Sequence, residues 1–135
     1  MPARSNFPPA AAERKKRRRR AHDRGRHAEA LAALYLTLKG YRILARGFRV
    51  DGGEIDLVAA KAGAIAFVEV KFRPTLAEAQ CAIDAAKRRR MSRAANVWLA
   101  ANPWAVALTL RGDALALAPW RWPHHSPAAV ELEIG

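Results

Sequence analysis

The chain has 135 residues, of which 51% are hydrophobic, so it has room for one domain and enough apolar residues to bury a core. Twenty-four lysines and arginines stand against twelve aspartates and glutamates, a formal net charge of +12 at pH 7. This composition excludes a wholly disordered chain, the single cysteine excludes an intramolecular disulfide framework, and the basic excess favours a polyanion as partner.

The basic excess is concentrated in two clusters. Residues 1–27 hold ten basic and two acidic residues, and residues 87–93 hold five more basic residues. We expect residues 1–22 to be a basic, disordered tail, because prolines at positions 2, 8 and 9 interrupt a helix and the like charges of residues 14–20 repel one another. This tail is either a solubilising arm or an arm that binds nucleic acid.

The first ordered element is predicted to be a helix over residues 24–39, with Asp23 as its N-cap and Gly40 just beyond its C-terminus. It is apolar nearly all round, so we expect it to pack against a sheet. Three strands are predicted next, over residues 41–50, 54–60 and 64–72. The turns between them are short and rich in glycine, which indicates an antiparallel meander.

The second half of the chain begins with a predicted long helix over residues 76–101. Thr75 is its expected N-cap, and Glu78 occupies the matching position of a capping box. The helix is predicted to end before Asn102-Pro103, because proline cannot continue it.

Two short strands are predicted to close the domain, over residues 104–111 and 114–118, with a turn at Gly112-Asp113. Residues 119–135 predict no regular element and are expected to be a C-terminal tail. The order α-β-β-β-α-β-β predicts an α/β domain with a mixed sheet over residues 23–118.

The localisation expected from the sequence is cytoplasmic, with no membrane partner. No apolar run reaches the roughly 18 residues that cross a membrane, and no apolar segment follows the N-terminal basic residues as in a secretory signal. Cys81 is expected to be a small apolar filler, since no basic partner that would activate its thiol is evident. His124-His125 lie in the proline-rich tail and are interpreted as incidental rather than as metal ligands.

Acidic residues within apolar strands are the feature that points to chemistry. Side chains alternate between the two faces of a strand, so Asp56 is predicted to lie on one face and Ile55 and Leu57 on the other. In the next strand Glu69 and Lys71 share a face, and they can converge with Asp56 if the two strands pair. Charged groups among apolar residues need a partner, a metal or a function.

The set Asp56, Glu69 and Lys71 suits phosphodiester hydrolysis. Mg²⁺ prefers oxygen ligands and keeps several waters, so two carboxylates on adjacent strands supply a rigid half-shell. A nearby ammonium can orient the attacking water, and the metal stabilises charge that builds on the phosphate. The alternative is an ordinary salt bridge, because Glu-x-Lys is common in strands.

Two segments of the sequence resemble the YraN-like family of small bacterial proteins, Gly53-Glu54-Ile55-Asp56-Leu57-Val58-Ala59 and Phe67-Val68-Glu69-Val70-Lys71-Phe72-Arg73. The resemblance covers about residues 25–118 and includes a Gly-x-x-Ala-Glu motif that ends at Glu29. That family belongs to the PD-(D/E)XK nuclease superfamily and is related to archaeal Holliday junction resolvases. The resemblance implies a restriction-endonuclease-like αβββαβ core with a central mixed sheet flanked by helices. Gly112 departs from it, since the family has an aromatic residue there.

The resemblance also implies roles for individual residues. Asp56 and Glu69 match the metal ligands, for which Mg²⁺ or Mn²⁺ is expected. Lys71 matches the lysine that polarises the attacking water or the scissile phosphate. Glu29 matches an acidic residue that assists the metal through water, or else is an ordinary surface carboxylate. Glu54 either supports the site or satisfies backbone and arginine partners.

DNA is the expected partner, held by the basic helix and the basic N-terminal arm. Lys87, Arg88 and Arg90, together with Arg73 at the end of its strand, are the predicted phosphate contacts, unless the helical run is only a solvated face. The leading hypothesis is therefore a metal-dependent endonuclease acting on DNA, including branched or single-stranded intermediates. The alternatives are a non-catalytic nucleic-acid-binding module and a DNA-processing adaptor. Related resolvases act as dimers, so the resemblance also implies a homodimer.

Overall fold

A five-stranded sheet forms the centre of the protein in this computed structural model, which describes residues 11–81 and 83–135. Its strands, adjacent in chain order, are β1 (Arg42–Val50), β2 (Gly53–Lys61), β3 (Ala64–Phe72), β4 (Thr109–Leu117) and β5 (His124–Val130). Only the pairing of β3 with β4 is parallel, so the sheet is mixed. The predicted α/β class, consistent with a restriction-endonuclease-like core, is confirmed.

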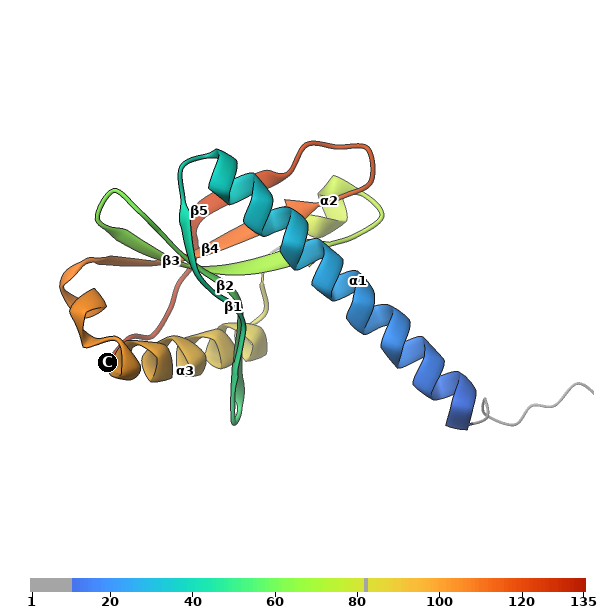
Figure 1. Cartoon of the computed structure of the whole chain (residues 1–135), viewed down its shortest axis with the longest axis horizontal. Coiled ribbons are helices and arrows are strands. Elements are labelled where there is room, and N and C mark those ends of the chain that lie inside the picture. Colours follow the sequence, from blue (N-terminus) through green and yellow to red (C-terminus); the bar gives the residue numbers. More distant parts are fainter. Residues whose placement is uncertain (1–10, 82) are drawn as a thin grey trace, which may run out of the picture.

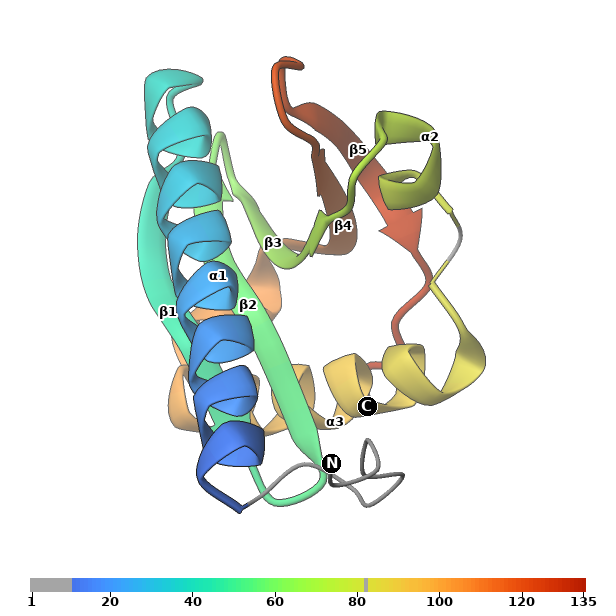
Figure 2. The ribbon, with the colours of Figure 1, turned by 90° about the vertical axis from the view of Figure 1, so that its right-hand side faces the viewer.

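Two helices cover opposite faces of this sheet (Figures 1 and 2). The first face packs against α1 (Ala11–Leu38), with Leu36 and Leu57 in its core, and the second packs against α3 (Ala85–Ala101), with Phe67 and Trp98 in its core. None of the helices in the described part of the chain combines the length and the apolar character needed to cross a membrane.

The predicted meander is confirmed to within one residue at each strand end. The β1–β2 and β2–β3 pairs are antiparallel and joined by tight turns. Gly52 and Gly63 adopt φ of +75° and +78° in these turns, which glycine accepts without a steric cost. The period-2 pattern and turn glycines therefore predict this part of the fold from local information.

The start of α1 differs from the prediction. The helix begins at Ala11 and runs through Asp23, so Asp23 is not an N-cap and residues 11–22 are helical rather than disordered. These residues follow the last proline of the segment and are mostly alanine, arginine and lysine, whose helix propensity outweighs their mutual repulsion. Residues 1–10 of the predicted tail lie outside the described residues, and the division of the chain at residues 22 and 118 stays a prediction.

The end of α1 is as predicted. Gly40 has φ +92°, its N–H donates to the Thr37 carbonyl, and the Tyr41 N–H donates to the Leu36 carbonyl. This Schellman pattern satisfies carbonyls that the last turn leaves free.

The long helix predicted over residues 76–101 is interrupted. A short helix, α2 (Leu76–Ala79), is capped by Thr75, whose hydroxyl accepts from the Glu78 N–H as expected. The chain then leaves the helix, and α3 starts anew after Asp84, whose carboxylate accepts from the Lys87 N–H at 2.8 Å. The physical reason is that aspartate is far better as an N-cap than inside a helix, which the prediction of one continuous helix does not take into account.

The predicted turn at Gly112-Asp113 is wrong, because both residues lie inside β4. Residues 103–107 form the 3₁₀ helix η1 (Pro103–Ala107), and the predicted tail contains β5. Gly112 does not form a turn but allows the backbone of β5 to come close to β4, because a Cβ there would lie 2.5 Å from the Val130 carbonyl oxygen. The pairing of β5 thus requires glycine at position 112, where the resemblance implied an aromatic residue.

A buried polar network ties the end of α1 to β4 and β5. Asp113 is fully buried and accepts hydrogen bonds from Arg111 Nε at 2.9 Å, from His125 Nε2 at 2.7 Å and from the Ala128 N–H at 3.0 Å. Lys39 Nζ lies 3.2 Å from His125 Nδ1 and can only donate, so we assign the imidazole proton to Nε2. Burial would raise the pKa of Asp113, but the hydrogen bonds of His125 and Arg111 outweigh burial and lower it.

Candidate active site

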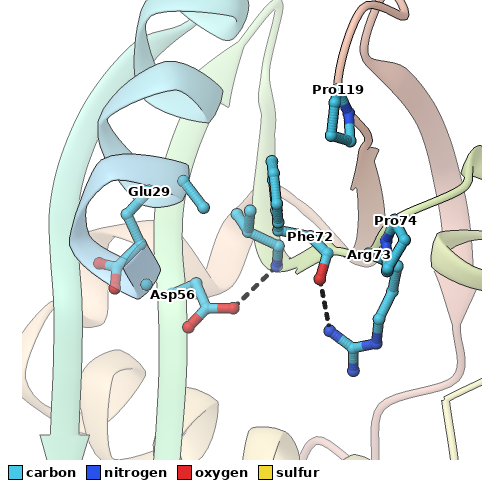
Figure 3. A pocket seen from close by; sticks show the side chains of 9 residues that line it. Glu29, Asp56, Phe72, Arg73, Pro74 and Pro119 are labelled. Atoms are coloured by element: carbon cyan, nitrogen blue, oxygen red, sulfur yellow. Dashed lines mark hydrogen bonds between the residues drawn. The ribbon is translucent and has the colours of Figure 1, made fainter. Parts of the chain in front are cut away.

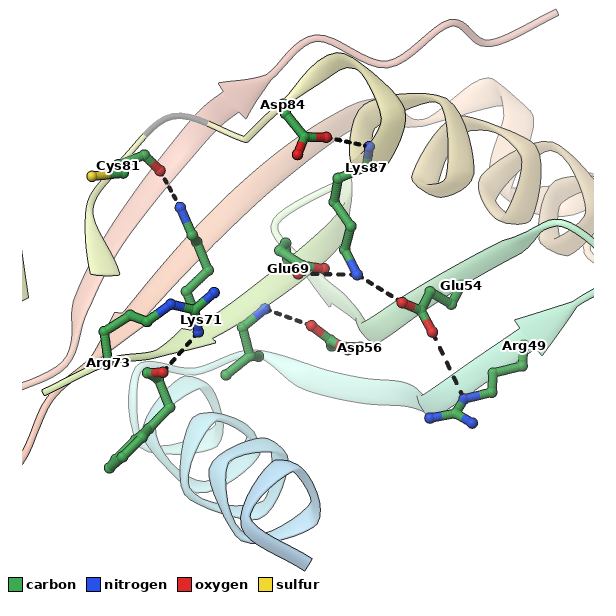
Figure 4. Close-up of polar contacts among 11 residues, drawn as sticks. Arg49, Glu54, Asp56, Glu69, Lys71, Arg73, Cys81, Asp84 and Lys87 are labelled. Atoms are coloured by element: carbon green, nitrogen blue, oxygen red, sulfur yellow. Dashed lines mark hydrogen bonds and ion pairs between the residues drawn. The ribbon is translucent and has the colours of Figure 1, made fainter. Parts of the chain in front are cut away.

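The candidate site forms where β2 and β3 separate. Backbone pairing between these strands stops at Leu57 and Val68, whereas β3 stays paired with β4 to its last residue. Asp56 is the next residue of β2 beyond the ladder, and its Oδ2 accepts a hydrogen bond from the Val70 N–H at 2.8 Å (Figure 4). The carboxylate therefore occupies the gap between the strands and satisfies a backbone donor that β2 no longer pairs.

The divergence of β2 also breaks the predicted alternation. Leu57 belongs to the core under α1, but Ile55 packs with Val58 in the core over α3, so Ile55 and Leu57 do not share a face. From Asp56 back to Gly53, the start of β2 stays paired with β1 and lies against α3. A Cβ on Gly53 would lie 2.7 Å from the Arg90 carbonyl oxygen of that helix. This contact with α3 turns the start of β2 out of the plane of β3.

Glu69 is the buried acid of the site. Its side chain is almost fully buried, and within the described residues no donor reaches its Oε2. In its protonated form the Glu69 carboxyl group hydrogen-bonds with Asp56. Burial, together with the negative charge of Asp56, raises the pKa of Glu69 to about 8. Lys87 opposes this shift without cancelling it. The two carboxylates predicted to converge thus lie close enough for Asp56 to raise the pKa of Glu69.

Lys87 enters this carboxylate cluster, although the sequence suggested a contact with phosphate. Its Nζ lies 2.7 Å from Glu54 Oε1 and 3.2 Å from Glu69 Oε1 (Figure 4). Burial lowers the pKa of Lys87, but the two glutamates outweigh burial and raise it. The pairing with Lys87 also lowers the pKa of Glu54, against the effect of burial. An N-cap at Asp84 would have placed Lys87 in the first turn of α3, but only the packing of α3 across the sheet brings this turn to Glu69.

Lys71 is held beside the cluster. Its ammonium donates to the backbone carbonyl of Cys81, in the segment that follows α2 (Figure 4). Cys81 itself is exposed and free, so the expectation of a buried apolar filler is wrong. The ammonium paired with Glu69 in this structure is consequently that of Lys87.

A cavity of about 540 Å³ opens on the α1 side of the site (Figure 3). Asp56 and Glu29 both line it, as the predicted role of Glu29 requires, and Arg73 lies at its wall and donates to the Phe72 carbonyl at 2.8 Å. Pro119 lies across the cavity from the two acidic residues (Figure 3). The cavity therefore brings together α1, β2, the end of β3 and the segment after β4.

A basic groove of about 490 Å³ adjoins this cavity through Glu29. Besides Glu29 it is lined by Arg26 of α1 and by Arg46, Gly47 and Arg49 of β1. No sequence pattern groups these arginines, because a helix and a strand contribute them separately. The other predicted phosphate contacts lie on α3, where Arg90 is exposed and Arg88 is half-buried with an Nε that lacks a partner among the described residues.

The donors available for a metal ion are carboxylate oxygens. Within residues 11–81 and 83–135 no three or more histidine, cysteine or acidic side chains lie together as a group that could hold a metal ion. Asp56 and Glu69 fit a hard divalent cation that keeps most of its waters, since Glu69 has a buried oxygen without a partner and a carboxyl group that resists ionisation in the absence of a cation.

Comparison with known proteins gives a family match. The family model described as "Uncharacterised protein family UPF0102", which comprises the YraN-like proteins, matches residues 28–117. A UPF0102 protein of Methylocella silvestris is 60% identical over 112 residues, which cover 83% of this chain and 90% of that one. One from Methylobacterium nodulans is 60% identical over 110 residues, or 82% and 85% of the two chains. One from Rhodopseudomonas palustris (strain HaA2) is 46% identical over 129 residues, or 96% and 97%.

Proposed function

The chain belongs to the UPF0102 family, and we propose that it is a metal-dependent endonuclease that hydrolyses phosphodiester bonds in DNA. One observation carries the proposal: Asp56 and Glu69 approach each other where β2 and β3 separate, and no donor of the described residues reaches the buried Oε2 of Glu69. A purely structural ion pair would satisfy both oxygens of a buried carboxylate, because an unsatisfied buried acceptor is costly. A site that takes up a cation leaves such an oxygen available.

Asp56 and Glu69 would hold Mg²⁺ or Mn²⁺ between the strands, and Glu29 would act on the metal's waters from α1. The cation, when bound, would stabilise the negative charge that develops on the phosphate. The Val70 N–H orients the Asp56 carboxylate, so this ligand is fixed before anything binds.

Two lysines would have separate roles, one in positioning the carboxylates and one in acting on the water or the phosphate. Lys87 holds Glu54 and Glu69 in place and is a positioning residue. Lys71 would orient the attacking water or polarise the scissile phosphate after its side chain rotates away from the Cys81 carbonyl, which is one hydrogen bond at the protein surface.

The basic groove of Arg26, Arg46 and Arg49 would hold the phosphate backbone beside the cavity. Arg73 would contact it at the cavity wall, while Arg88 and Arg90 would contact it from α3. Such contacts are sequence-independent and weaken as salt rises.

A non-catalytic nucleic-acid-binding module, or a DNA-processing adaptor, is the second candidate. The Lys87 ammonium favours it, because a cation of the protein itself already lies between Glu54 and Glu69 and partly neutralises the cluster. In that case the carboxylates would serve only to position α3 against the sheet.

Cleavage assays separate the two candidates. Labelled branched, single-stranded and duplex DNA would be incubated with the protein in Mg²⁺, in Mn²⁺ and in chelator, alongside Asp56→Asn, Lys71→Ala and a control, Glu131→Gln, at an exposed position. We expect metal-dependent cleavage by the wild type and the control, and a loss of about a hundred-fold or more in the two site variants. If all proteins bind DNA equally and none cuts any substrate, the nuclease proposal fails and the binding module stands.

A further inference from the structure

Two exposed tryptophans lie in the segment that joins β4 to β5, and Pro119 of the same segment lines the cavity. Within this tryptophan loop (residues 118–123), Trp120 is fully exposed, Trp122 is 86% exposed, and the exposed Arg121 lies between them. Pro119, next to Trp120, lines the cavity across from Glu29 and Asp56 (Figure 3). The loop lies outside residues 28–117, the part of the chain that the family model matches.

The backbone of the loop makes Trp120 an unfavourable choice for folding. The Arg121 N–H donates to the Ala118 carbonyl at 3.3 Å and closes a four-residue turn. Its second residue, Pro119, has φ fixed near −65°, and its third, Trp120, has φ of +62°. These are the positions of a type II turn, which favours glycine as the third residue.

Folding therefore offers no reason for an indole at this position. A bulky residue with positive φ is strained, and a fully exposed ring recovers none of that strain through burial. Strain of this kind, next to a candidate active site, points to a ligand that the side chain contacts.

We infer that Trp120 and Trp122 stack on unpaired bases of a nucleic acid whose backbone enters the adjoining cavity. Aromatic rings stack on any exposed base, whereas the bases of a continuous duplex cover one another's faces. Arg121 supplies a positive charge for the phosphates between stacked bases, and Phe72, 41% exposed on the cavity wall, offers a further ring. The inference rests on the proposed use of this cavity by DNA and names its substrate class, strands with unpaired bases.

Binding without cleavage tests the inference. Fluorescence anisotropy would measure the affinity for a labelled oligothymidylate and for a labelled duplex of equal length, in chelator and at one salt concentration. The variants are Trp120→Gly and Trp122→Ala, with Trp120→Phe and Trp122→Phe as matched controls that keep a ring. Thermal unfolding of each variant checks the fold.

We expect each ring-removing variant to lose about ten-fold in affinity for oligothymidylate and less than about two-fold for duplex, because stacking needs an open base face. The phenylalanine controls should retain most of the affinity. Trp120→Gly should unfold at the same temperature as the wild type or higher, because glycine relieves the turn. A loss of binding with a retained melting temperature would thus not reflect misfolding.

Three results would overturn the inference: unchanged affinity in the ring-removing variants, equal losses for both DNA forms, or binding through the same tryptophans to phosphatidylglycerol vesicles without preference for single strands. The binding assay does not depend on cleavage. If the protein cuts no substrate but prefers single strands through these tryptophans, only the nuclease proposal is refuted. Metal-dependent cleavage by a protein whose ring-removing variants keep their affinity would refute only the inference.

Discussion

Glu69 and Asp113 are both buried carboxylates on the same sheet, but their surroundings are opposite. Arg111, with two of its nitrogens, His125 and the Ala128 backbone donate to Asp113, and its pKa is lowered. Glu69 has one cationic partner, Lys87, a second oxygen without a partner among the described residues, and a pKa raised to about 8.

The difference separates a structural acid from the acid of the proposed metal site. Asp113 is ionised at little cost because its hydrogen bonds replace the lost water, so it stabilises the packing of β5. Glu69 is kept close to Asp56 at a cost to folding, which is the pattern expected of a site that a cation completes. Burial alone would not have distinguished the two residues.

The largest expected effect concerns the structural acid, Asp113. Asp113→Ala leaves Arg111 and His125 without their common partner, and removing one member of a buried ion pair costs about 3–5 kcal/mol. Urea unfolding would measure the decrease in unfolding free energy, with Asp51→Ala at the exposed turn before β2 as the control. A decrease below about 1 kcal/mol, a typical surface value, would show that the network does not hold β5 in place.

A metal titration tests the proposed role of Glu69 and Asp56 as metal ligands. At a hundred-fold excess over its dissociation constant, a cation that binds only the folded protein stabilises it by about 2.7 kcal/mol. We therefore expect Mn²⁺ to raise the melting temperature of the wild type and of Asp51→Asn but not that of Asp56→Asn or Glu69→Gln, measured against chelator. Equal shifts in all four proteins would place the bound cation elsewhere.

The basic groove adjoins, through Glu29, the cavity that Asp56 lines. Arg46→Ala and Arg49→Ala should each weaken DNA binding regardless of sequence and reduce the slope of log affinity against log salt by about 0.9 for each duplex phosphate that is no longer neutralised. Anisotropy over a salt series measures the slope. Arg42→Ala, an exposed arginine of β1 that does not line the groove, serves as the control and should leave it unchanged.

The smallest effect concerns the acid stability of Asp113. Because its pKa in the folded protein lies below the usual 3.8, its ionised form stabilises the fold fully above that value. This contribution is lost as the pH falls through the lowered pKa. The difference in unfolding free energy between the wild type and Asp113→Asn should thus be constant at neutral pH and shrink below about pH 4. A difference that shrinks as pH rises would contradict the assigned direction.

Much of the site was predictable because its signals are local. Asp56 and Glu69 stand out as charges within apolar strands, and the tight turns predict that these strands are neighbours. The role of Lys87 was not predictable in the same way, since it depends on α3 starting after Asp84 and lying across the sheet. The arginine groove was not predicted for a similar reason, because its members are brought together only when α1 packs on β1.

Local sequence is enough to specify the meander, the α/β class and the family, because strand periodicity, turn glycines and motif spacing act over a few residues. Long-range packing is needed for β2 to leave β3 at Asp56, for Asp113 to be buried and for β5 to pair with β4. Each of these outcomes depends on contacts between segments distant in the chain. The basic residues illustrate both cases. Their clusters are visible in the sequence, but only packing places Lys87 among acidic residues that it partly neutralises. Packing also brings Arg26, Arg46 and Arg49 together along one groove.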